Sequence, residues 1–361
     1  MKSGAIFQSA TELIDLIQST EKPANDIINA YTRARRYIGS KDRRALTDLV
    51  WGYIRHRRRL MFLAPAGDTA ERLRLLQTGA AESVPEASFA VNMEVPDWIL
   101  PFIPDVESEL PALLDSAPTV LRVNGNRDKI RAELKQAGID TDPTPLSPYG
   151  LILKGRANLQ TLSCYREGRL EVQDEGSQLI ALETGIRPGD KVLDYCAGAG
   201  GKSLIFAQMM QDRGIIVAHD SIRSRLSELH RRANRAHLKC IQIPDSIPDI
   251  GFDHVVADVP CSGTGTWRRT PDMRWKLTPE RLAELTRIQS DIFDSAVRFV
   301  RPGGFISYMT CSLLRPEDEA QVDSFLKRHP TLRLIRAKRF SPALTKTDGF
   351  FVAIFQSGSE S

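Results

Sequence analysis

The first hundred residues carry apolar side chains at helical spacing and show no alternating strand pattern. Over residues 46–54 the apolar positions recur at i, i+3, i+4, i+7 and i+8, which predicts an amphipathic helix. Apolar stripes at 27–31 and 70–77 predict two more helices. We therefore expect an all-α domain over residues 1–85, followed by a proline-rich, acidic connector over 86–117.

The next segment, residues 118–172, mixes strand-like and helical patterns. Residues 120–123 and 150–153 are short aliphatic runs that predict strands, and residues 128–137 predict a helix between them. These patterns predict a small α+β subdomain, similar to an RNA-recognition-motif fold.

From residue 173 to residue 361, strand and helix patterns alternate. The expected strands are 191–194, 214–220, 238–243, 252–258, 304–310 and 349–355, and the expected helices are 203–210, 224–236, 279–300 and 316–328. Such alternation predicts an α/β, Rossmann-like doubly wound domain. Its functional residues should lie at the carboxyl ends of the strands.

Composition narrows the class of protein. The 361 residues are 42% hydrophobic and 26% charged, which is typical of a soluble globular chain. No apolar run is long enough for a transmembrane helix, and the first residues do not resemble a secretory signal. The five cysteines form no C-x-x-C pair, so we expect free thiols, no metal site and a cytoplasmic location. A monomer is the default expectation.

A glycine-rich turn, 194–203, follows a predicted strand and opens a predicted helix. A phosphate-binding Walker A loop is excluded because Cys196 stands where its first glycine is required. A dinucleotide fingerprint would need a glycine at Ser203. S-adenosylmethionine needs only an open turn beside acidic residues, and Asp194 and Asp220 end two consecutive strands. A structural turn without a ligand is the alternative, and Asp220 counts against it.

Two cysteines follow two other predicted strands. Cys261 and Cys311 should share one cleft, because these strands are neighbours in a doubly wound sheet. For Cys164 and Cys240 a buried, inert thiol is the better interpretation, and Cys196 should line the glycine turn.

A thiol pair at this place suits chemistry on cytosine. Carbon 5 of the base is a poor nucleophile until a thiolate adds at carbon 6, after which carbon 5 can accept a methyl group. Asp258, just before Cys261, is placed to accept a hydrogen bond from the amino edge of the base. The residues alone leave open which thiol attacks.

These motifs resemble the RsmB/Nop/Sun family of RNA cytosine-carbon-5 methyltransferases over about residues 118–357. The likeness is carried by Asp194-x-Cys-Ala-Gly-Ala-Gly-Gly-Lys202, Asp258-Val-Pro-Cys261-Ser-Gly-Thr-Gly and Thr310-Cys311-Ser312, with support from Leu121-Arg-Val-Asn124, Gln173-Asp-Glu-Gly-Ser-Gln178, Arg268-Arg-x-Pro-Asp-x-Arg-Trp275, Pro316-Glu-Asp-Glu319 and Asp348-Gly-Phe-Phe351. Residues 39–55 are similar to the NusB-like, RNA-binding helical domain of bacterial members.

The resemblance implies roles for individual residues. Cys311 would be the nucleophile and Cys261 would assist proton removal or product release, with Asp258 and Lys202 also catalytic. The implied S-adenosylmethionine contacts are Asp194, Cys196, Ala197, Gly198, Ala199, Gly200, Gly201, Lys202, Asp220, Arg225, Asp245 and Asp258. The sequence departs from the family at Gly198-Ala199, where Ala-Pro is common; we expect binding to survive because the backbone makes the contact.

Basic residues suggest where RNA binds. Residues 33–59 hold ten Lys or Arg against two Asp, with aromatic residues interleaved. A solvated helix face is the bland alternative. The candidate RNA contacts are Arg43, Arg44, Arg55, Arg57, Arg58, Arg268, Arg269 and Arg274. The implied substrate is small-subunit ribosomal RNA, with transfer RNA as the alternative. A catalytically inactive, RNA-binding ribosome-assembly factor and a methyltransferase acting on small molecules or proteins are the competing hypotheses.

Overall fold

The computed structural model describes residues 3–35 and 37–358. The chain forms two compact units. The first comprises residues 1–116 together with 266–281, and the second comprises residues 117–265 and 282–361. None of the helices described is both long and apolar enough to cross a membrane.

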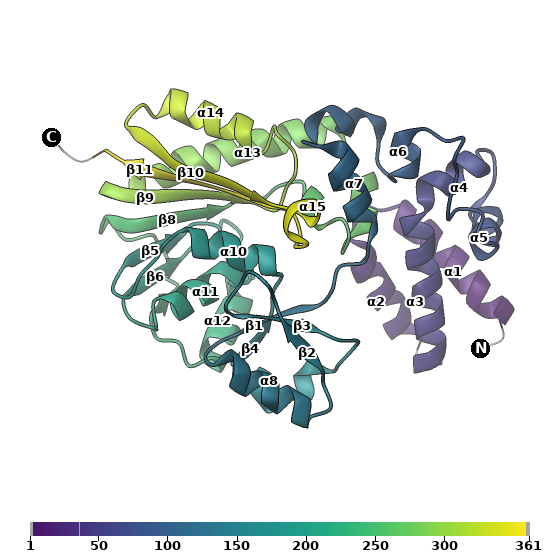
Figure 1. Ribbon diagram of the computed structural model, residues 1–361, viewed down its shortest axis with the longest axis horizontal. Coiled ribbons are helices and arrows are strands. Elements are labelled where there is room, and N and C mark those ends of the chain that lie inside the picture. The colour runs from purple at the N-terminus through teal and green to yellow at the C-terminus, as the bar shows by residue number, and fades with distance from the viewer. Residues whose placement is uncertain (1–2, 36, 359–361) are drawn as a thin grey trace. The chain divides into compact units, whose positions relative to one another are not determined.

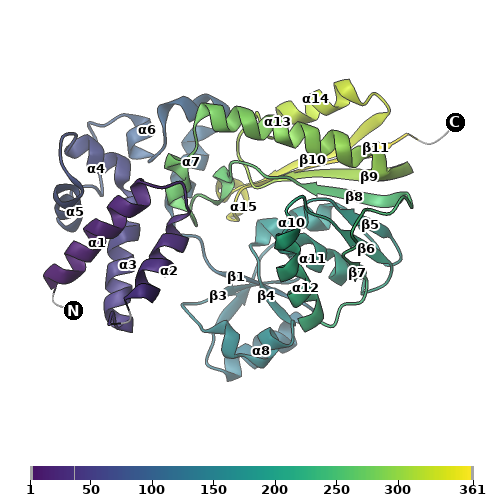
Figure 2. The same cartoon turned by 180° about the vertical axis from the view of Figure 1, so that it is seen from behind.

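The first unit is helical throughout its described residues. Its elements are α1 (Ser3–Gln18), α2 (Ala24–Ala34), α3 (Ser40–Arg55), α4 (Arg57–Leu63), α5 (Thr69–Gln77), α6 (Phe89–Asn92), η1 (Asp97–Phe102), α7 (Val106–Leu114) and η5 (Pro271–Trp275). Helices α1, α2 and α3 lie side by side (Figure 2) and bury Leu13, Ile28, Leu46 and Tyr53 between them. The apolar stripe over 46–54 is therefore the buried face of α3.

Two segments of the first unit differ from the sequence expectation. The stretch 86–117 contains the helical turns α6, η1 and α7 where a plain connector was expected. Residues 266–281, expected within the catalytic region, pack into the helical unit instead. There Asp272 accepts a 2.9 Å hydrogen bond from the backbone N–H of Ala24, and Arg274 donates a 2.7 Å hydrogen bond to the carbonyl of Leu113.

The second unit begins with a small antiparallel sheet in the order β2-β3-β1-β4. Its elements are β1 (Val120–Val123), α8 (Arg127–Gln136), β2 (Thr141–Pro143), β3 (Gly150–Leu153), η2 (Leu159–Thr161), α9 (Ser163–Arg166) and β4 (Leu170–Val172). The strands β1 and β3 and helix α8 match the expected elements, and they bury Leu121, Ile130 and Leu151. The strands β2 and β4 have three residues each, too few for a recognisable alternation.

A seven-stranded sheet in the order β10-β11-β9-β8-β5-β6-β7 forms the centre of the second unit. The elements are α10 (Glu175–Glu183), β5 (Lys191–Asp194), α11 (Gly201–Met209), β6 (Ile215–Ala218), η3 (Arg223–Arg225), α12 (Leu226–Arg235), β7 (Ile241–Gln242), β8 (Phe252–Asp258), η4 (Thr264–Thr266), α13 (Pro279–Ala296), η6 (Val297–Phe299), β9 (Val300–Thr310), α14 (Glu319–Arg328), β10 (Leu332–Phe340), α15 (Pro342–Thr345) and β11 (Phe350–Ser357). The strands β7, β6, β5, β8 and β9 are parallel, whereas β11 and β10 are antiparallel additions at one edge.

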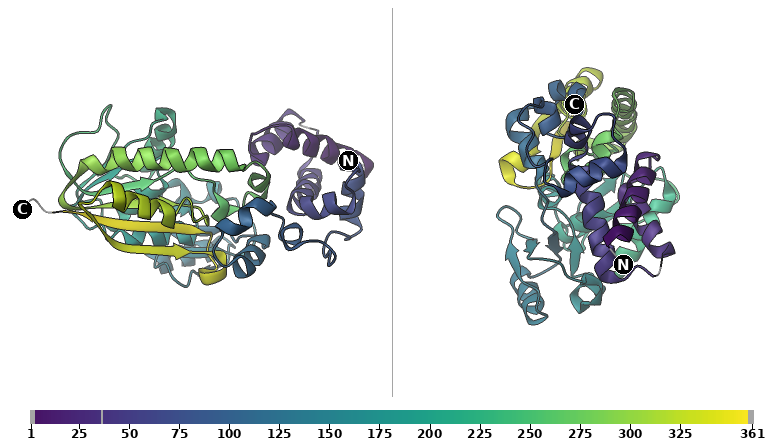
Figure 3. Two further views of the ribbon diagram at one scale, coloured as in Figure 1. Left: turned by 90° about the horizontal axis from the view of Figure 1, so that it is seen from above. Right: turned by 90° about the vertical axis from the view of Figure 1, so that its right-hand side faces the viewer.

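Helices cover both faces of this sheet, so the expected Rossmann-like architecture is observed. Figure 1 shows α10, α11 and α12 on one face, and α13 and α14 on the other; Figure 3 shows α13 running along the sheet. Successive strand residues enter opposite cores. Val192 packs with Phe206 of α11, and its neighbour Leu193 packs in the core that holds Phe293 of α13 and Phe325 of α14.

The chain reverses its direction of winding between β5 and β8. After β5 it proceeds to β6 and β7 on one side, then returns to add β8 and β9 on the other. The carboxyl ends of β5 and β8 therefore border a crevice of the kind in which doubly wound proteins bind ligands. The glycine turn follows β5, and the Cys261 turn follows β8.

Candidate active site

The glycine turn after β5 is shaped by one close approach to α12. Gly200 has a φ of +85°, and a Cβ at this position would lie 2.2 Å from Cδ1 of Leu229. Only glycine fits such a position without moving α12. The turn is also tied to β6, because the N–H of Gly198 donates a 3.0 Å hydrogen bond to Asp220, whose other oxygen accepts the N–H of Ile222 at 2.8 Å. The backbone N–H groups of Gly198 and Ile222 thus hold the Asp220 carboxylate beside the turn.

Asp194 ends β5 with a side chain that is fully buried. Its Oδ2 accepts a 2.6 Å hydrogen bond from the Ser203 hydroxyl, whereas its Oδ1 has no hydrogen-bond partner among the described residues. Burial raises the pKa of Asp194 to about 7, with Asp258 and Asp220 adding to the rise. A buried carboxyl oxygen without a donor is suited to receive a cationic group.

Lys202 and Asp258 form an ion pair across the crevice. The Lys202 ammonium lies 3.0 Å from Asp258 and donates a 2.9 Å hydrogen bond to Ser177. The Phe350 ring, 5.5 Å from the ammonium, completes its surroundings. Sequence reasoning missed Ser177 as a site residue, although it stands in the Gln173–Gln178 motif.

Cys261 and Cys311 lie together, as the strand order predicted. Their sulfurs are 3.3 Å apart, and the two strands that precede them, β8 and β9, pair in parallel. The contact with Cys311 and burial raise the pKa of Cys261 well above its ordinary value. Cys261 therefore keeps its proton at neutral pH and can donate it in a hydrogen bond to the Cys311 sulfur.

The other three cysteines have surroundings that disfavour the thiolate. Cys164 and Cys240 are buried, and burial raises the pKa of Cys164 and raises that of Cys240 to about 12. Burial and the nearby Asp194 raise the pKa of Cys196 in the glycine turn. Low reactivity is thus expected of all three thiols.

Two residues that were expected to contact the methyl donor, Asp245 and Arg225, lie on the surface. Asp245 has an exposed side chain, paired at 2.5 Å with Arg223. Arg225 is also exposed, in η3, and its charge acts on the thiol of Cys196. The contact of Asp245 within the described residues is with Arg223, and its role toward the methyl donor stays a prediction.

The candidate RNA-binding arginines fall into different environments. Arg43 and Arg44 on α3 are exposed. Arg55, Arg57 and Arg58 are half-buried and contact, in turn, the carbonyl of Arg268, the Trp275 ring and Asp97. Arg36, in the same basic stretch, lies outside the described residues.

Two arginines that were expected to contact RNA are buried. Arg268 and Arg274 are only 6% and 3% exposed, which leaves little surface for a phosphate. Arg274 binds the carbonyl of Leu113 and lies over the Trp267 ring, and burial lowers its pKa to about 10. Sequence gives charge without exposure, so this burial could not be predicted, and an RNA contact of either side chain stays a prediction. Arg269 is half-buried.

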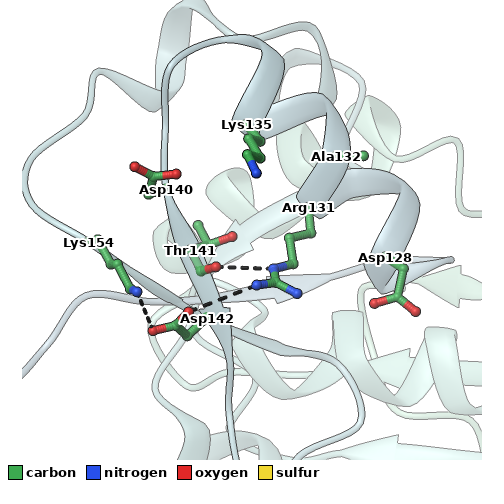
Figure 4. Close-up of a pocket in the computed structure, with 8 residues that line it drawn as sticks. All are labelled: Asp128, Arg131, Ala132, Lys135, Asp140, Thr141, Asp142 and Lys154. Carbon is green, nitrogen blue, oxygen red and sulfur yellow. Dashed lines mark hydrogen bonds and ion pairs between the residues drawn. The ribbon is translucent and has the colours of Figure 1, made fainter.

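A separate pocket lies on the small subdomain (Figure 4). It has a volume of about 460 Å³. Lys154 lies 2.8 Å from Asp142, and Arg131 lies 3.9 Å from the same carboxylate, so these two basic groups at its wall are already paired. Its lining residues are Asp128, Arg131, Ala132, Lys135, Asp140, Thr141, Asp142 and Lys154. Within the described residues there is no cluster of three or more acidic, His or Cys side chains that could hold a metal ion.

The sequence of the catalytic unit matches a known family. A family model described as 16S rRNA methyltransferase RsmB/F matches residues 181–356. Over these residues the chain is similar to the RsmB/F family. The matched range contains the glycine turn, Asp220, Asp258 and both site cysteines. The family similarity and the geometry therefore converge on the same strand ends.

Curated RsmB/F relatives are longer proteins. Ribosomal RNA small subunit methyltransferase B of Vibrio cholerae is 30% identical over 280 residues, covering 72% of this chain and 64% of the relative. The protein of the same name from Photorhabdus laumondii is 31% identical over 283 residues, covering 72% and 65%. The chain thus spans less than two thirds of the length of either relative.

The fold also occurs in a solved structure. The chain PH0851 superposes with a TM-score of 0.81 at 21% identity, covering 98% of both chains. At this identity the likeness concerns the fold, and it extends beyond the catalytic unit to the helical unit.

Proposed function

We propose that this chain methylates carbon 5 of a cytosine in RNA, with S-adenosylmethionine as methyl donor and Cys311 as the attacking thiolate. The observation that carries the proposal is the 3.3 Å approach of the Cys261 and Cys311 sulfurs at the ends of adjacent strands. Such a pair suits a reaction in which one sulfur attacks the base and the other assists its departure.

The residues at the carboxyl ends of β5 and β6 fit the methyl donor. The unpartnered oxygen of Asp194 can receive the ammonium of the methionine part, and Asp220 stands where a carboxylate binds ribose hydroxyls. The bend at Gly198 and Gly200 lets the backbone approach a ligand closely. S-adenosylmethionine, when bound, supplies an electrophilic methyl group.

The thiol pair divides the covalent work. The Cys311 thiolate adds to carbon 6 of the cytosine, which makes carbon 5 nucleophilic enough to take the methyl group. Loss of the carbon-5 proton and cleavage of the sulfur–carbon bond then restore the aromatic ring. A hydrogen bond from the Cys261 thiol stabilises the departing Cys311 thiolate. Removal of Cys261 should therefore slow release more than attack.

Asp258 and Lys202 orient the base. Asp258, three residues before Cys261, can accept a hydrogen bond from the cytosine amino group, and its ion pair with Lys202 fixes the carboxylate. Because a paired base cannot reach a thiol at a strand end, the target must be unpaired or flipped out of a helix.

The substrate is small-subunit ribosomal RNA, which is the RNA named for the family and for its curated relatives. Transfer RNA is the alternative. An assembly factor that had lost catalysis would have no need of two facing thiols beside a lysine–aspartate pair, so the intact site favours an enzyme. No observation favours methylation of a small molecule or a protein.

Covalent trapping tests the proposal. Wild type, Cys261→Ala and Cys311→Ala are incubated with S-adenosylmethionine and total bacterial RNA, then denatured. We expect a persistent protein–RNA adduct with Cys261→Ala and none with Cys311→Ala. An adduct in Cys311→Ala would exchange the two roles. Absence of both adduct and methyl transfer in every protein, wild type included, would favour the inactive assembly factor.

A further inference from the structure

Beneath the two cysteines lies a carboxylate that the reaction itself does not use. Glu317 is completely buried, six residues after Cys311, in the loop that leads to α14. A buried carboxylate is costly unless donors surround it. The hydrogen-bond donors around Glu317 therefore indicate which parts of the site it positions.

Both cysteine turns donate hydrogen bonds to Glu317. Ser262, next to Cys261, donates its backbone N–H at 2.8 Å and also its hydroxyl. Ser312, next to Cys311, donates its hydroxyl at 2.5 Å. Gln289 of α13 donates at 2.9 Å and binds the carbonyl of Pro260 at 3.0 Å. One carboxylate thus ties together the ends of β8 and β9.

The hydrogen bonds of Glu317 are shared unequally between the two cysteine turns. Two of its hydrogen bonds come from Ser262, directly after Cys261, and only one comes from Ser312. On the other side, the Arg339 guanidinium donates a 3.3 Å hydrogen bond to the carbonyl of Ser312, directly after Cys311. The further charged or titratable groups around the pair are Asp258, Lys202, Tyr308, Asp318 and Glu319.

We infer that Glu317 is a positioning residue that holds the Cys261 and Cys311 turns together and places its carboxylate beside the Cys261 turn. The inference rests on the proposed function for its purpose, but its geometry is independent of any substrate. Contact with Cys311, burial and the Glu317 charge all raise the pKa of Cys261. A proton kept on Cys261 is available for a hydrogen bond to the Cys311 sulfur.

The substitution Glu317→Gln removes the charge of the side chain and keeps its size and shape. The glutamine Oε1 can still accept from Ser262 N–H and Gln289, and its Nε2 can donate to the Ser262 and Ser312 hydroxyls, which rotate to accept. The variant should therefore fold, which a thermal melt verifies. Ser312→Ala provides the complementary change, because it removes one donor and leaves the charge.

The decisive readout is thiol alkylation by iodoacetamide across about pH 7 to 11, quantified for the peptide that contains Cys261. In a Cys311→Ser background, we expect Glu317→Gln to lower the pH of half-maximal Cys261 alkylation by about one unit. Glu319→Gln, two residues away with a half-exposed side chain, is the matched control and should leave Cys261 unchanged.

Methyl transfer completes the test. Glu317→Gln should lower kcat about 10–100-fold, because the sulfurs lose their fixed charge and alignment. Ser312→Ala should lower kcat without moving the Cys261 midpoint. An unshifted Cys261 midpoint in Glu317→Gln, or an equal shift in Glu319→Gln, would overturn the inference. Alkylation needs neither RNA nor methyl donor, so a wild type that fails to methylate RNA refutes the proposed function alone.

Discussion

Two buried carboxyl groups of the catalytic unit differ in how many of their oxygens have a hydrogen-bond partner. Glu317 accepts donors at both oxygens, whereas Asp194 has a partner at only one. A satisfied carboxylate organises protein, and a half-satisfied one is ready for a ligand. The contrast separates a residue that shapes the site from one that binds within it.

The half-satisfied state of Asp194 predicts how donor binding depends on pH. The pKa of this buried carboxyl is raised to about 7, so at pH 6 it is mostly protonated in the free protein. Pairing with the donor's ammonium requires the ionised form, so binding must expel a proton below pH 7. Affinity for S-adenosylmethionine should therefore fall as pH drops from 8 to 6, with proton release detectable by titration calorimetry in two buffers.

Asp194→Asn should abolish that pH dependence and weaken binding at pH 8 about 10–100-fold, the value of a lost charged hydrogen bond. Asp253→Asn is the control, because Asp253 lies near the opposite end of the sheet and binds Lys191 and Arg301. Wild-type affinity that stays constant between pH 6 and 8 would contradict this account.

At the scale of elements, α4 depends on a buried carboxylate at its first turn. Glu94 accepts the backbone N–H groups of Arg58 and Arg59 at 2.7 and 3.1 Å and pairs with the Arg59 guanidinium at 3.4 Å. It thereby satisfies donors that the start of a helix leaves open. Burial nevertheless raises the pKa of Glu94 to about 7.

The raised pKa gives a signed prediction for folding stability. A carboxyl whose pKa is higher in the folded state contributes stability that is complete below its unfolded value and is lost as pH rises through about 7. Wild type should therefore lose stability relative to Glu94→Gln when the pH is raised from 5 to 8. The free energy of unfolding of the variant, compared with wild type, should rise by about 1–3 kcal/mol over this range. Urea melts at both values measure it, with Glu82→Gln as an exposed control. A difference that does not change with pH would exclude this role for the carboxyl.

The elements also show what the sequence could and could not predict. The strands β5, β6, β8, β9 and β11 were predicted because they are buried aliphatic runs. The edge strand β10 was missed, since charged residues interrupt its pattern and most of its side chains are exposed. Glu317 was visible within a motif, but its partners Ser262 and Gln289 lie far from it in sequence, so only the fold could reveal their contact.

At the scale of the whole molecule, the basic residues of the helical unit divide into buried and exposed groups. Arg268 and Arg274 are buried, which sequence could not show because it gives charge without exposure. Arg43 and Arg44 remain exposed on α3. If they neutralise phosphates, their removal must change the salt dependence of binding.

We expect the double change Arg43→Ala/Arg44→Ala to reduce the slope of log affinity against log salt by about 1.4–1.8, the value for two phosphate contacts. Fluorescence anisotropy with a labelled small-subunit rRNA fragment would measure the slope between 50 and 200 mM salt, a range in which such contacts lose affinity steeply. Arg231→Ala, a 64% exposed arginine side chain on α12, is the control. An unchanged slope would indicate that Arg43 and Arg44 form a solvated face of α3 and do not contact phosphates.

The discontinuity of the helical unit has a consequence for biosynthesis. Residues 266–281 supply Asp272 to the start of α2 and Arg274 to the end of α7, yet they are translated about 150 residues after residue 116. At about 5–20 residues per second, the ribosome delivers them on the order of ten seconds later. During that interval the nascent helices lack residues 266–281, while the strands β5 to β8 of the second unit are already being made. The helical unit is therefore the first to be started, but it is completed only when residue 281 has been made, after most of the second unit.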